Sequence, residues 1–440
     1  MITNQLVKNI LDTKLEDIPE NVKQHGQKSF LNWLGVAIGA AHHPSVDIVL
    51  GLKEELKWAE DVSILGRKEK SDLLTATLIN GMSSHIFDFD DTHLDTIHHP
   101  SGPVAPVVLA LGEKYDVDPD KLLLAFILGC EAELRISNAV YPSHYDLGWH
   151  ITSTAGVFGS AIAAGVIFGL DEDQLSQALG IAGTQASGLR EVFGTMTKPF
   201  HPGKAAQNGL LAAMLAKKGF TSSKTVLEAK RGFANVLAPE HQLESVNINW
   251  GKQWELLKNS FKPYACGIVL HPSIDACVKL REKSSVDKIE RIEIKVNPYV
   301  LELTGKKEPK TGLEGKFSIY HSASVGFLYG EAGEDQYSDE VVNSEEVLSL
   351  RNKIYPQVDE TFTEDEALAK LVLKDGQTFE YEVKHATGSI DNPMSDEALQ
   401  TKFKRVTAPI ISETKANTLI DKIYNWTEIN SVSELLSHTK

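Results

Sequence analysis

The stretch "STAGVFGSAIAAGVIFG", residues 153–169, is apolar or small around the whole circumference of a helix. In a soluble chain, a helix of this kind is buried among other helices. Apolar residues recur at three- and four-residue spacing in the segments around it, which is typical of helices. These segments are residues 29–41, 106–115, 120–137 and 171–187. The sequence therefore predicts a mainly α protein with an all-helical core.

The pattern changes after about residue 260. Residues 289–297, "IERIEIKVN", alternate apolar and charged side chains, and residues 367–386 hold two strand-like runs joined at Asp375-Gly376, a hairpin signal. A helical tail follows at 417–438. We therefore predict two domains. A large helical domain would comprise residues 1–258 and 400–440, and a smaller α+β lid domain, residues 259–399, would be inserted between them.

Composition narrows the class of protein. The chain has 440 residues, of which 42% are hydrophobic and 24% charged, as expected of a globular protein with two or three domains. Its N-terminus, "MITNQLVKNILDTKLED", has no signal-peptide pattern, and no apolar run approaches the length of a membrane span. Its three cysteines lack CxxC spacing. These features predict a cytoplasmic protein without disulfides.

Charge limits the partners. A formal net charge of −16 argues against nucleic acid as a partner, because phosphate binding requires a basic surface. A small anionic substrate stays possible, since a few cationic side chains in a cleft outweigh the global charge locally.

The stretch "HIFDFDDTHLDTIHHPSGP", residues 85–103, is rich in aspartate and histidine. Three interpretations are open: a solvated helix end, a metal site, or acid/base machinery. If the stretch continues a helix, His85, Asp88 and Thr92 share one face. Asp90, Asp91 and Asp95 would then have helix-surface roles. A metal site is disfavoured because HExxH and HxH spacings are absent, whereas acid/base chemistry needs only a histidine held by a carboxylate beside a cleft. His98 and His99 meet that need.

Cationic residues precede proline at several places. The pairs begin at His99, Lys198, His201, Lys262 and His271. Proline restricts the backbone of its neighbour, so this pattern favours a site that holds positive groups in place. The alternative is that these prolines only begin or end helices.

Six motifs taken in order resemble the MmgE/PrpD family. They are "FDFDDTH…HPSGPVAPVVLAL", "GWHITSTAG", "GTMTKPFHPGKAAQNG", "FKPYACGIVLHP", "KFSIYHSA" and "NPMSDEALQTKF". The family contains 2-methylcitrate dehydratases, cis-aconitate decarboxylases and iminodisuccinate epimerases. The resemblance covers nearly the whole chain. It implies a helical domain built from both chain ends, an inserted α+β lid, a homodimer, and no cofactor.

The resemblance to the decarboxylases also implies the site residues. They are Asp88, Thr92, His99, His150, Lys198, Lys262 and Tyr320. The loop after Thr92 is one residue longer here, so His98 is the alternative to His99 and a candidate for substrate binding. His150, Lys198 and Lys262 would bind the substrate carboxylates.

The same resemblance bears on the reaction. The family's dehydratases carry HPSDN where this chain has HPSGP, so Gly102 replaces an aspartate. We therefore expect cofactor-independent decarboxylation of cis-aconitate to itaconate, through an allylic carbanion that a histidine protonates. The alternatives are epimerase-like or dehydratase-like activity on a related di- or tricarboxylate, and an inactive carboxylate-binding protein.

Overall fold

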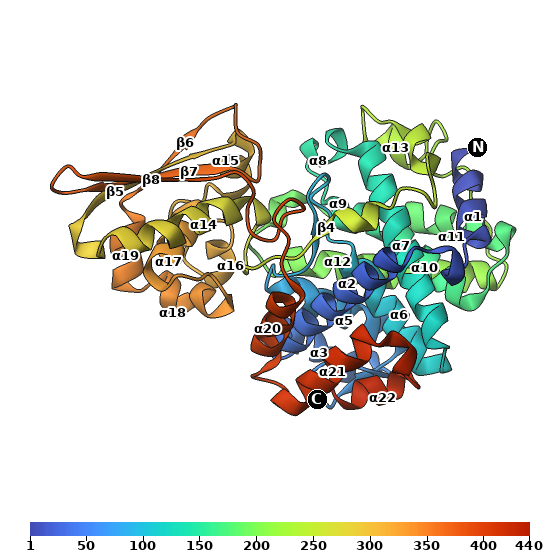
Figure 1. Cartoon of the computed structure of the whole chain (residues 1–440). Helices are drawn as coiled ribbons and strands as arrows, with labels where there is room; N and C mark the ends of the chain where they lie inside the picture. Colours follow the sequence, from blue (N-terminus) through green and yellow to red (C-terminus); the bar gives the residue numbers. More distant parts are fainter.

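The computed structural model describes all 440 residues and shows two groups of elements side by side (Figure 1). The larger group, called the helical part here, contains α1 (Ile2–Asp12), α2 (Glu20–Gly39), α3 (Pro44–Leu50), α4 (Lys53–Leu56), α5 (Leu73–Ile86), α6 (Ser101–Tyr115), α7 (Pro119–Val140), α8 (Ser143–Asp146), α9 (Ile151–Thr154), α10 (Gly156–Phe168), α11 (Glu172–Gly183), α12 (Thr197–Lys217), α13 (Phe233–Leu237), α20 (Asp396–Thr407), α21 (Glu413–Tyr424) and α22 (Val432–Ser437). Helices thus dominate the chain, as the sequence predicts.

The smaller group, the sheet part, is built on a four-stranded sheet. Its strands are β5 (Ile289–Val296), β6 (Ile354–Val358), β7 (Ala367–Leu373) and β8 (Thr378–Val383), and its helices are α14 (His271–Leu280), α15 (Pro298–Thr304), α16 (Gly312–Gly315), α17 (Ile319–Tyr329), α18 (Asp339–Val342) and α19 (Glu345–Arg351). The strand order is β6-β5-β7-β8, with β5 and β6 parallel and the other pairs antiparallel. The hairpin predicted at Asp375-Gly376 is confirmed: Gly376 has φ +87°, the left-handed conformation such a turn requires.

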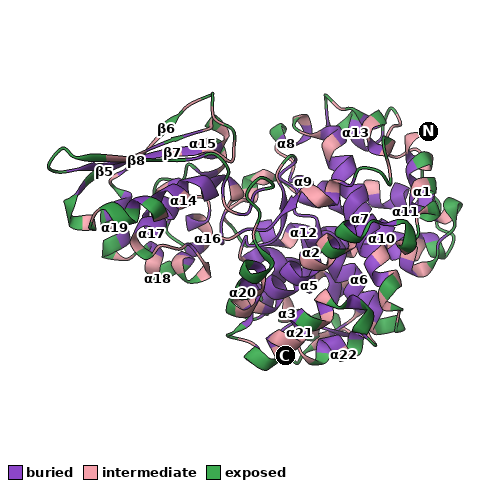
Figure 2. Ribbon diagram, viewed as in Figure 1, coloured by how far each residue is buried: buried purple, intermediate pink, exposed green.

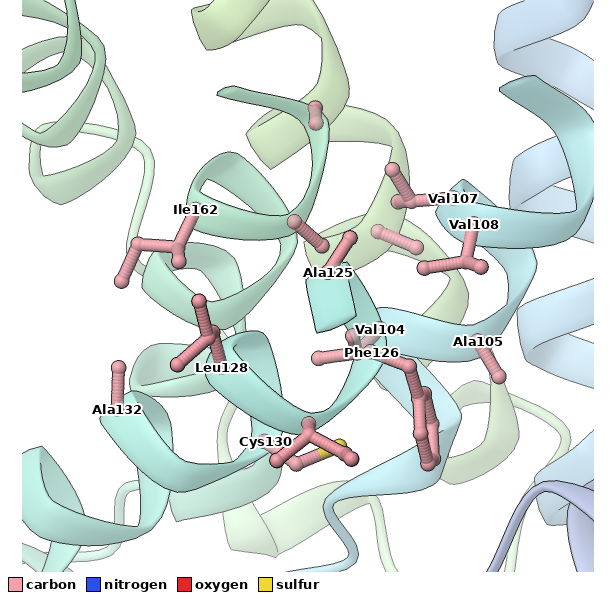
Figure 3. Close-up of a cluster of buried hydrophobic side chains, with 14 of the residues drawn as sticks. Val104, Ala105, Val107, Val108, Ala125, Phe126, Leu128, Cys130, Ala132 and Ile162 are labelled. Atoms are coloured by element: carbon pink, nitrogen blue, oxygen red, sulfur yellow. The ribbon is translucent and has the colours of Figure 1, made fainter. Parts of the chain in front are cut away.

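Each predicted helical segment contains a helix, although some segments run past its end, as residues 171–187 do where α11 ends at Gly183. Residues 153–169 fall in α9 and α10, which are separated at Ala155, and α10 packs against α7 and α12. Figure 3 shows Ile162 of α10 in the same cluster of buried side chains as Leu128 of α7. The window Ile151–Phe168 is long and apolar enough to cross a membrane, but 89% of it is buried inside the structure. Its apolar surface is therefore that of a core helix.

Two large hydrophobic cores and a third cluster of 6 buried residues hold the molecule together. The larger has 75 buried residues, which come from Leu6 to Leu256 and from Phe403 to Leu436. The C-terminal helices thus pack on the N-terminal ones, and the indole N–H of Trp426 donates to the carbonyl of Pro119 at 2.8 Å. The smaller core has 29 residues, nearly all between Ala265 and Val383. In Figure 2 the buried residues, in purple, lie mostly in the interior of both parts.

Candidate functional site

A cavity lies where the two parts meet. Fourteen residues line it, and its empty volume is about 430 Å³, part of which is open to solvent. Five of the residues predicted for the site line it, namely Asp88, His99, His150, Lys198 and Lys262. The structure therefore brings side chains more than 170 positions apart in sequence into one pocket.

The prediction that α5 continues through Thr92 is wrong. The helix ends at Ile86, and Asp88 has φ +49°, a left-handed conformation uncommon for residues other than glycine. The chain then forms the short strand β3 (Thr92–His93) and turns back before α6. His85, Asp88 and Thr92 are thus not on one helical face, because only His85 lies in the helix, Asp88 has left-handed backbone angles and Thr92 lies in a strand.

Strand pairing places Lys262 beside this loop. β3 pairs antiparallel with β4 (Asn259–Ser260), and Thr92 lies opposite Ser260. Lys262 follows two residues after β4, so the pairing fixes where its side chain begins.

Glycines bring α12 to the same place. At the crossing of α5 and α12, a Cβ added to Gly81 would lie 2.7 Å from Cα of Gly203. Only residues without a side chain permit this close approach. It sets Lys198 and His201, near the start of α12, against the end of α5.

Asp88 binds both lysines. Lys198 Nζ lies 2.7 Å from its Oδ2 and Lys262 Nζ lies 2.5 Å from its Oδ1. Burial alone would raise the pKa of Asp88, but the two ammonium groups outweigh it and hold this pKa well below the usual range. Burial lowers the pKa of Lys198, and Asp88 opposes that effect. The carboxylate therefore keeps two cations fixed at the cavity wall.

His99 lies in the cavity wall with one ring nitrogen engaged. Its Nδ1 is 3.0 Å from the carbonyl oxygen of Asp91 and 3.0 Å from Oγ1 of Thr92. A carbonyl oxygen only accepts, so Nδ1 carries a proton and Nε2, which makes no hydrogen bond with the protein, is available to a ligand. Burial lowers the pKa of His99 to about 3, so its ring is neutral near pH 7 in the free protein.

Asp90 and Asp91 are buried, so the predicted helix-surface role is wrong for both. His85 Nδ1 donates to Asp90 Oδ2 at 2.6 Å, and the same oxygen is 3.7 Å from His99 Nδ1. Asp91 accepts from Ser101 Oγ at 2.5 Å, and burial raises its pKa to about 7. Asp95 is exposed, as predicted. Sequence reasoning missed these roles because it extended the helix too far.

His150 lies in the same cavity wall as His99, with the two ring centres 6.4 Å apart. It precedes α9, and its Nδ1 is 2.8 Å from Nδ1 of His201. Burial lowers the pKa of His150 well below the usual range and that of His201 to about 4. One ring must donate to the other, so both rings are held in place while the second nitrogen of His150 makes no protein hydrogen bond.

Three predicted residues do not line the cavity. The first, Thr92, contacts the lining residue His99 through its Oγ1, 3.0 Å from Nδ1. His98 is fully buried, with Nδ1 2.8 Å from Ser137 Oγ and Nε2 3.3 Å from Glu133 Oε1. Tyr320 packs against the smaller core. The geometry therefore favours His99 over its neighbour as the residue that faces a ligand.

Two phenylalanines that the sequence did not point to complete the pocket. Lys198 Nζ lies 5.3 Å from the ring centre of Phe193 and 4.9 Å from that of Phe317. Such contacts stabilise a cation. Phe193 directly precedes the "GTMTKPFHPGKAAQNG" motif and Phe317 is the second residue of "KFSIYHSA", so their place at those motifs is the sequence signal for them.

Three buried histidines have the spacing of metal ligands, and two of them, His99 and His150, line the cavity. One ring nitrogen from each of His85, His99 and His150 lies within 4.8 Å of the others. Neutral imidazoles are suitable ligands, and Asp90 orients His85 as a carboxylate orients a metal-bound histidine. The ammonium groups of Lys198 and Lys262, however, make this wall better suited to anions.

Family models match most of the chain. The model of the MmgE/PrpD N-terminal domain matches residues 4–246, and that of the MmgE/PrpD C-terminal domain matches residues 264–428.

The chain belongs to the MmgE/PrpD family.

Curated relatives of this MmgE/PrpD protein are enzymes. A cis-aconitate decarboxylase of Homo sapiens is 29% identical over 385 residues, covering 83% of this chain and 79% of the relative. A cis-aconitate decarboxylase of Aspergillus terreus is 25% identical over 452 residues, covering 96% and 92%. A mitochondrial 2-methylcitrate dehydratase of Yarrowia lipolytica is 25% identical over 281 residues, covering 58% and 53%. The similarity supports a lyase of the decarboxylase type.

Proposed function

We propose that this protein decarboxylates cis-aconitate to itaconate without a cofactor. The observation that carries the proposal is the cavity in which Asp88 holds Lys198 and Lys262, with His99 and His150 in the same wall. Cationic groups fixed in advance stabilise the negative charge that develops when carbon dioxide leaves. The names of the relatives agree with this reaction.

The reaction has two steps. The bond between the CH2 carbon and its carboxylate breaks, carbon dioxide leaves, and the electron pair spreads over the three-carbon allylic system. The far carbon of that system, which lies beside a carboxylate, then takes a proton, and the double bond moves to the former CH2 carbon. Lys198, Lys262 and His150 would bind the carboxylates, and Nε2 of His99 would deliver the proton.

Proton delivery requires His99 to be charged. In the free protein its ring is neutral, and the charges of Lys198, Lys262, Asp88 and Asp90 balance. A bound trianion adds negative charge and so favours the imidazolium form of His99. Asp90, 3.7 Å from Nδ1, favours the same form. We therefore propose that substrate binding and protonation of His99 are coupled.

Gly102 supports the decarboxylase over the dehydratase. It is buried in α6, and a Cβ added there would lie 3.0 Å from Cβ of Pro202. A side chain at this position would therefore need Pro202 of α12 to shift slightly, and an aspartate would in addition be buried there. Epimerase-like activity needs only proton removal and return beside a carboxylate, so it stays the second candidate. The remaining alternative is a silent protein that binds the carboxylate without turnover.

We also propose that the protein is a cytoplasmic homodimer and that the sheet part acts as a lid. Gly267, Ile268, Val269, Leu303 and Phe317 line the cavity from that side, so its movement would open the pocket.

A substrate panel tests the proposed activity. Purified protein is assayed with cis-aconitate, 2-methylcitrate, citrate and iminodisuccinate side by side. We expect itaconate and carbon dioxide from cis-aconitate alone. Turnover of another substrate with none of cis-aconitate would overturn the assignment, and calorimetric binding of tricarboxylates without turnover would indicate the silent protein.

A further inference from the structure

Two buried lysines outside the catalytic cavity bind the backbone that carries Asp88 and Lys262. The first is Lys402 of α20. Its Nζ donates to the carbonyl of Phe89 at 2.6 Å, to the carbonyl of Lys262 at 2.9 Å and to Oδ1 of Asn32 at 2.7 Å. All three N–H groups of its ammonium therefore have acceptors. Two of these acceptors are backbone carbonyls at the site: that of Phe89, the residue after Asp88, and that of Lys262 itself.

The second is Lys316, which lies just after α16. Its Nζ donates to the carbonyl of Phe87 at 2.8 Å, to the carbonyl of Ala265 at 2.9 Å and to Oε2 of Glu334 at 2.5 Å. Lys316 is only 1% exposed. Each lysine thus joins the same two segments, residues 87–89 and 262–265, one on either side of Asp88.

These segments have a cavity on both sides. Asp88 and Lys262 line the catalytic cavity, whereas Phe87, Phe89, Pro263 and Tyr264 line a second cavity with an empty volume of about 910 Å³, part of which is open to solvent. Close packing, which normally fixes a buried backbone, is therefore interrupted along both segments. Asp88 in addition has its left-handed φ of +49°, which needs outside support to persist.

We propose that Lys316 and Lys402 are positioning residues that set the distance between Asp88 and Lys262, and through Asp88 the place of Lys198. Neither lysine lines the catalytic cavity, so each acts through the carbonyl groups it binds. The consequence for turnover rests on the proposed function, but the effect on the backbone does not.

The test uses Lys402→Met and Lys316→Met, which keep most of the side-chain volume and remove the ammonium group. The matched control is Lys353→Met. Lys353 Nζ also donates to a backbone carbonyl, that of Ile289 at 3.0 Å, but it lies in the sheet part away from the cavity. Hydrogen exchange by mass spectrometry is measured on peptides that cover residues 87–93 and 259–266, and kcat and KM are measured with the substrate that the wild type turns over.

We expect faster exchange in these two segments and a loss of about 10- to 100-fold in kcat for both site variants, with folding midpoints that leave the protein native under assay conditions. The control should change neither the exchange there nor kcat. Unchanged exchange, unchanged kcat, or global unfolding of both variants would overturn the proposal. A wild type without turnover would overturn the proposed function alone, since the exchange result still decides whether the lysines hold the segments.

Discussion

The Nδ1 atom of His99 lies 3.0 Å from the carbonyl oxygen of Asp91. Because that oxygen only accepts, it fixes the proton on Nδ1 and leaves Nε2 to the cavity. His99 is therefore held in the tautomer in which a second proton on Nε2 is the one it can give away.

Replacing His99 tests this assignment. We expect His99→Ala to lower kcat by about 10²- to 10⁴-fold, because a positioned proton donor contributes that much. The folded state should survive, which circular dichroism and thermal melting check. The comparison is His98→Asn, which disturbs the contacts with Ser137 and Glu133 and so should affect stability more than chemistry. A folded His98→Asn protein without turnover, together with an active His99→Ala protein, would reverse the two roles.

Removing the carboxylate of Asp88 should lower the free energy of unfolding. In Asp88→Asn, the two buried ammonium groups of Lys198 and Lys262 lose their counter-charge, and we expect about 3–5 kcal/mol less unfolding free energy. Urea unfolding measures this. Asp95→Asn is the control, since Asp95 is exposed and its ion pair with Lys258 is at the surface. Equal midpoints for the two variants would show that Asp88 does not hold the lysines.

Acid should destabilise the protein through its buried histidines. Burial lowers the pKa of six of them to about 3 or 4, namely His25, His99, His144, His201, His271 and His321. Between pH 6.5 and pH 4 the unfolded chain therefore binds more protons at these rings than the folded one. Buried carboxyl groups with raised pKa values act in the opposite direction but are fewer: the pKa values of Asp91 and Glu334 are raised to about 7, and burial also raises those of Glu131, Glu133 and Asp275.

Stability from these histidines is thus fully present above about pH 6.5 and is lost as the pH falls toward 4. We expect the unfolding free energy to be lower at pH 5 than at pH 7 by at least about 1 kcal/mol. Urea titrations at the two pH values check this. Equal or greater stability at pH 5 would mean that the rings are charged in the folded state.

Close helix crossing should make Gly203 intolerant of a side chain. A Cβ there would lie 2.2 Å from the carbonyl oxygen of Leu78, so we expect Gly203→Ala to lower the unfolding free energy by about 1–3 kcal/mol. Gly51→Ala is the comparison, because Gly51 is exposed at the end of α3 with φ −57°. Similar melting temperatures would contradict the tight approach of α5 and α12.

Metal removal should leave turnover intact. The experiment tests a real alternative, because the cluster of His85, His99 and His150 has the spacing of metal ligands. We expect full activity after exhaustive dialysis against a chelator, with metal content checked by mass spectrometry. Activity that falls with chelation and returns with one added metal would require a metal-dependent reaction.

The sequence was informative where local pattern decides structure. Apolar spacing located the helices around α10, and Asp375-Gly376 located the hairpin, because both depend on near neighbours. The motifs also pointed to Asp88, His99, His150, Lys198 and Lys262, which the structure gathers in one cavity.

Other features depend on contacts that no local pattern encodes. The helix predicted through Thr92 fails at the left-handed Asp88, and this error placed Asp90 and Asp91 at the surface although both are buried. Lys402 reaches the carbonyl of Phe89 across 313 positions of sequence, so only the folded chain shows its role. His98 and His99 are adjacent and similar, and their different partners separate them.

The most direct test of the central claim is to run the reaction with cis-aconitate in D2O and to follow the products by NMR. The account predicts one molecule of carbon dioxide for each molecule of itaconate. It also predicts one deuterium atom in the saturated CH2 group of itaconate, because His99 protonates the far carbon of the allylic anion. Deuterium in the vinyl CH2 group, or the absence of itaconate and carbon dioxide, would contradict it.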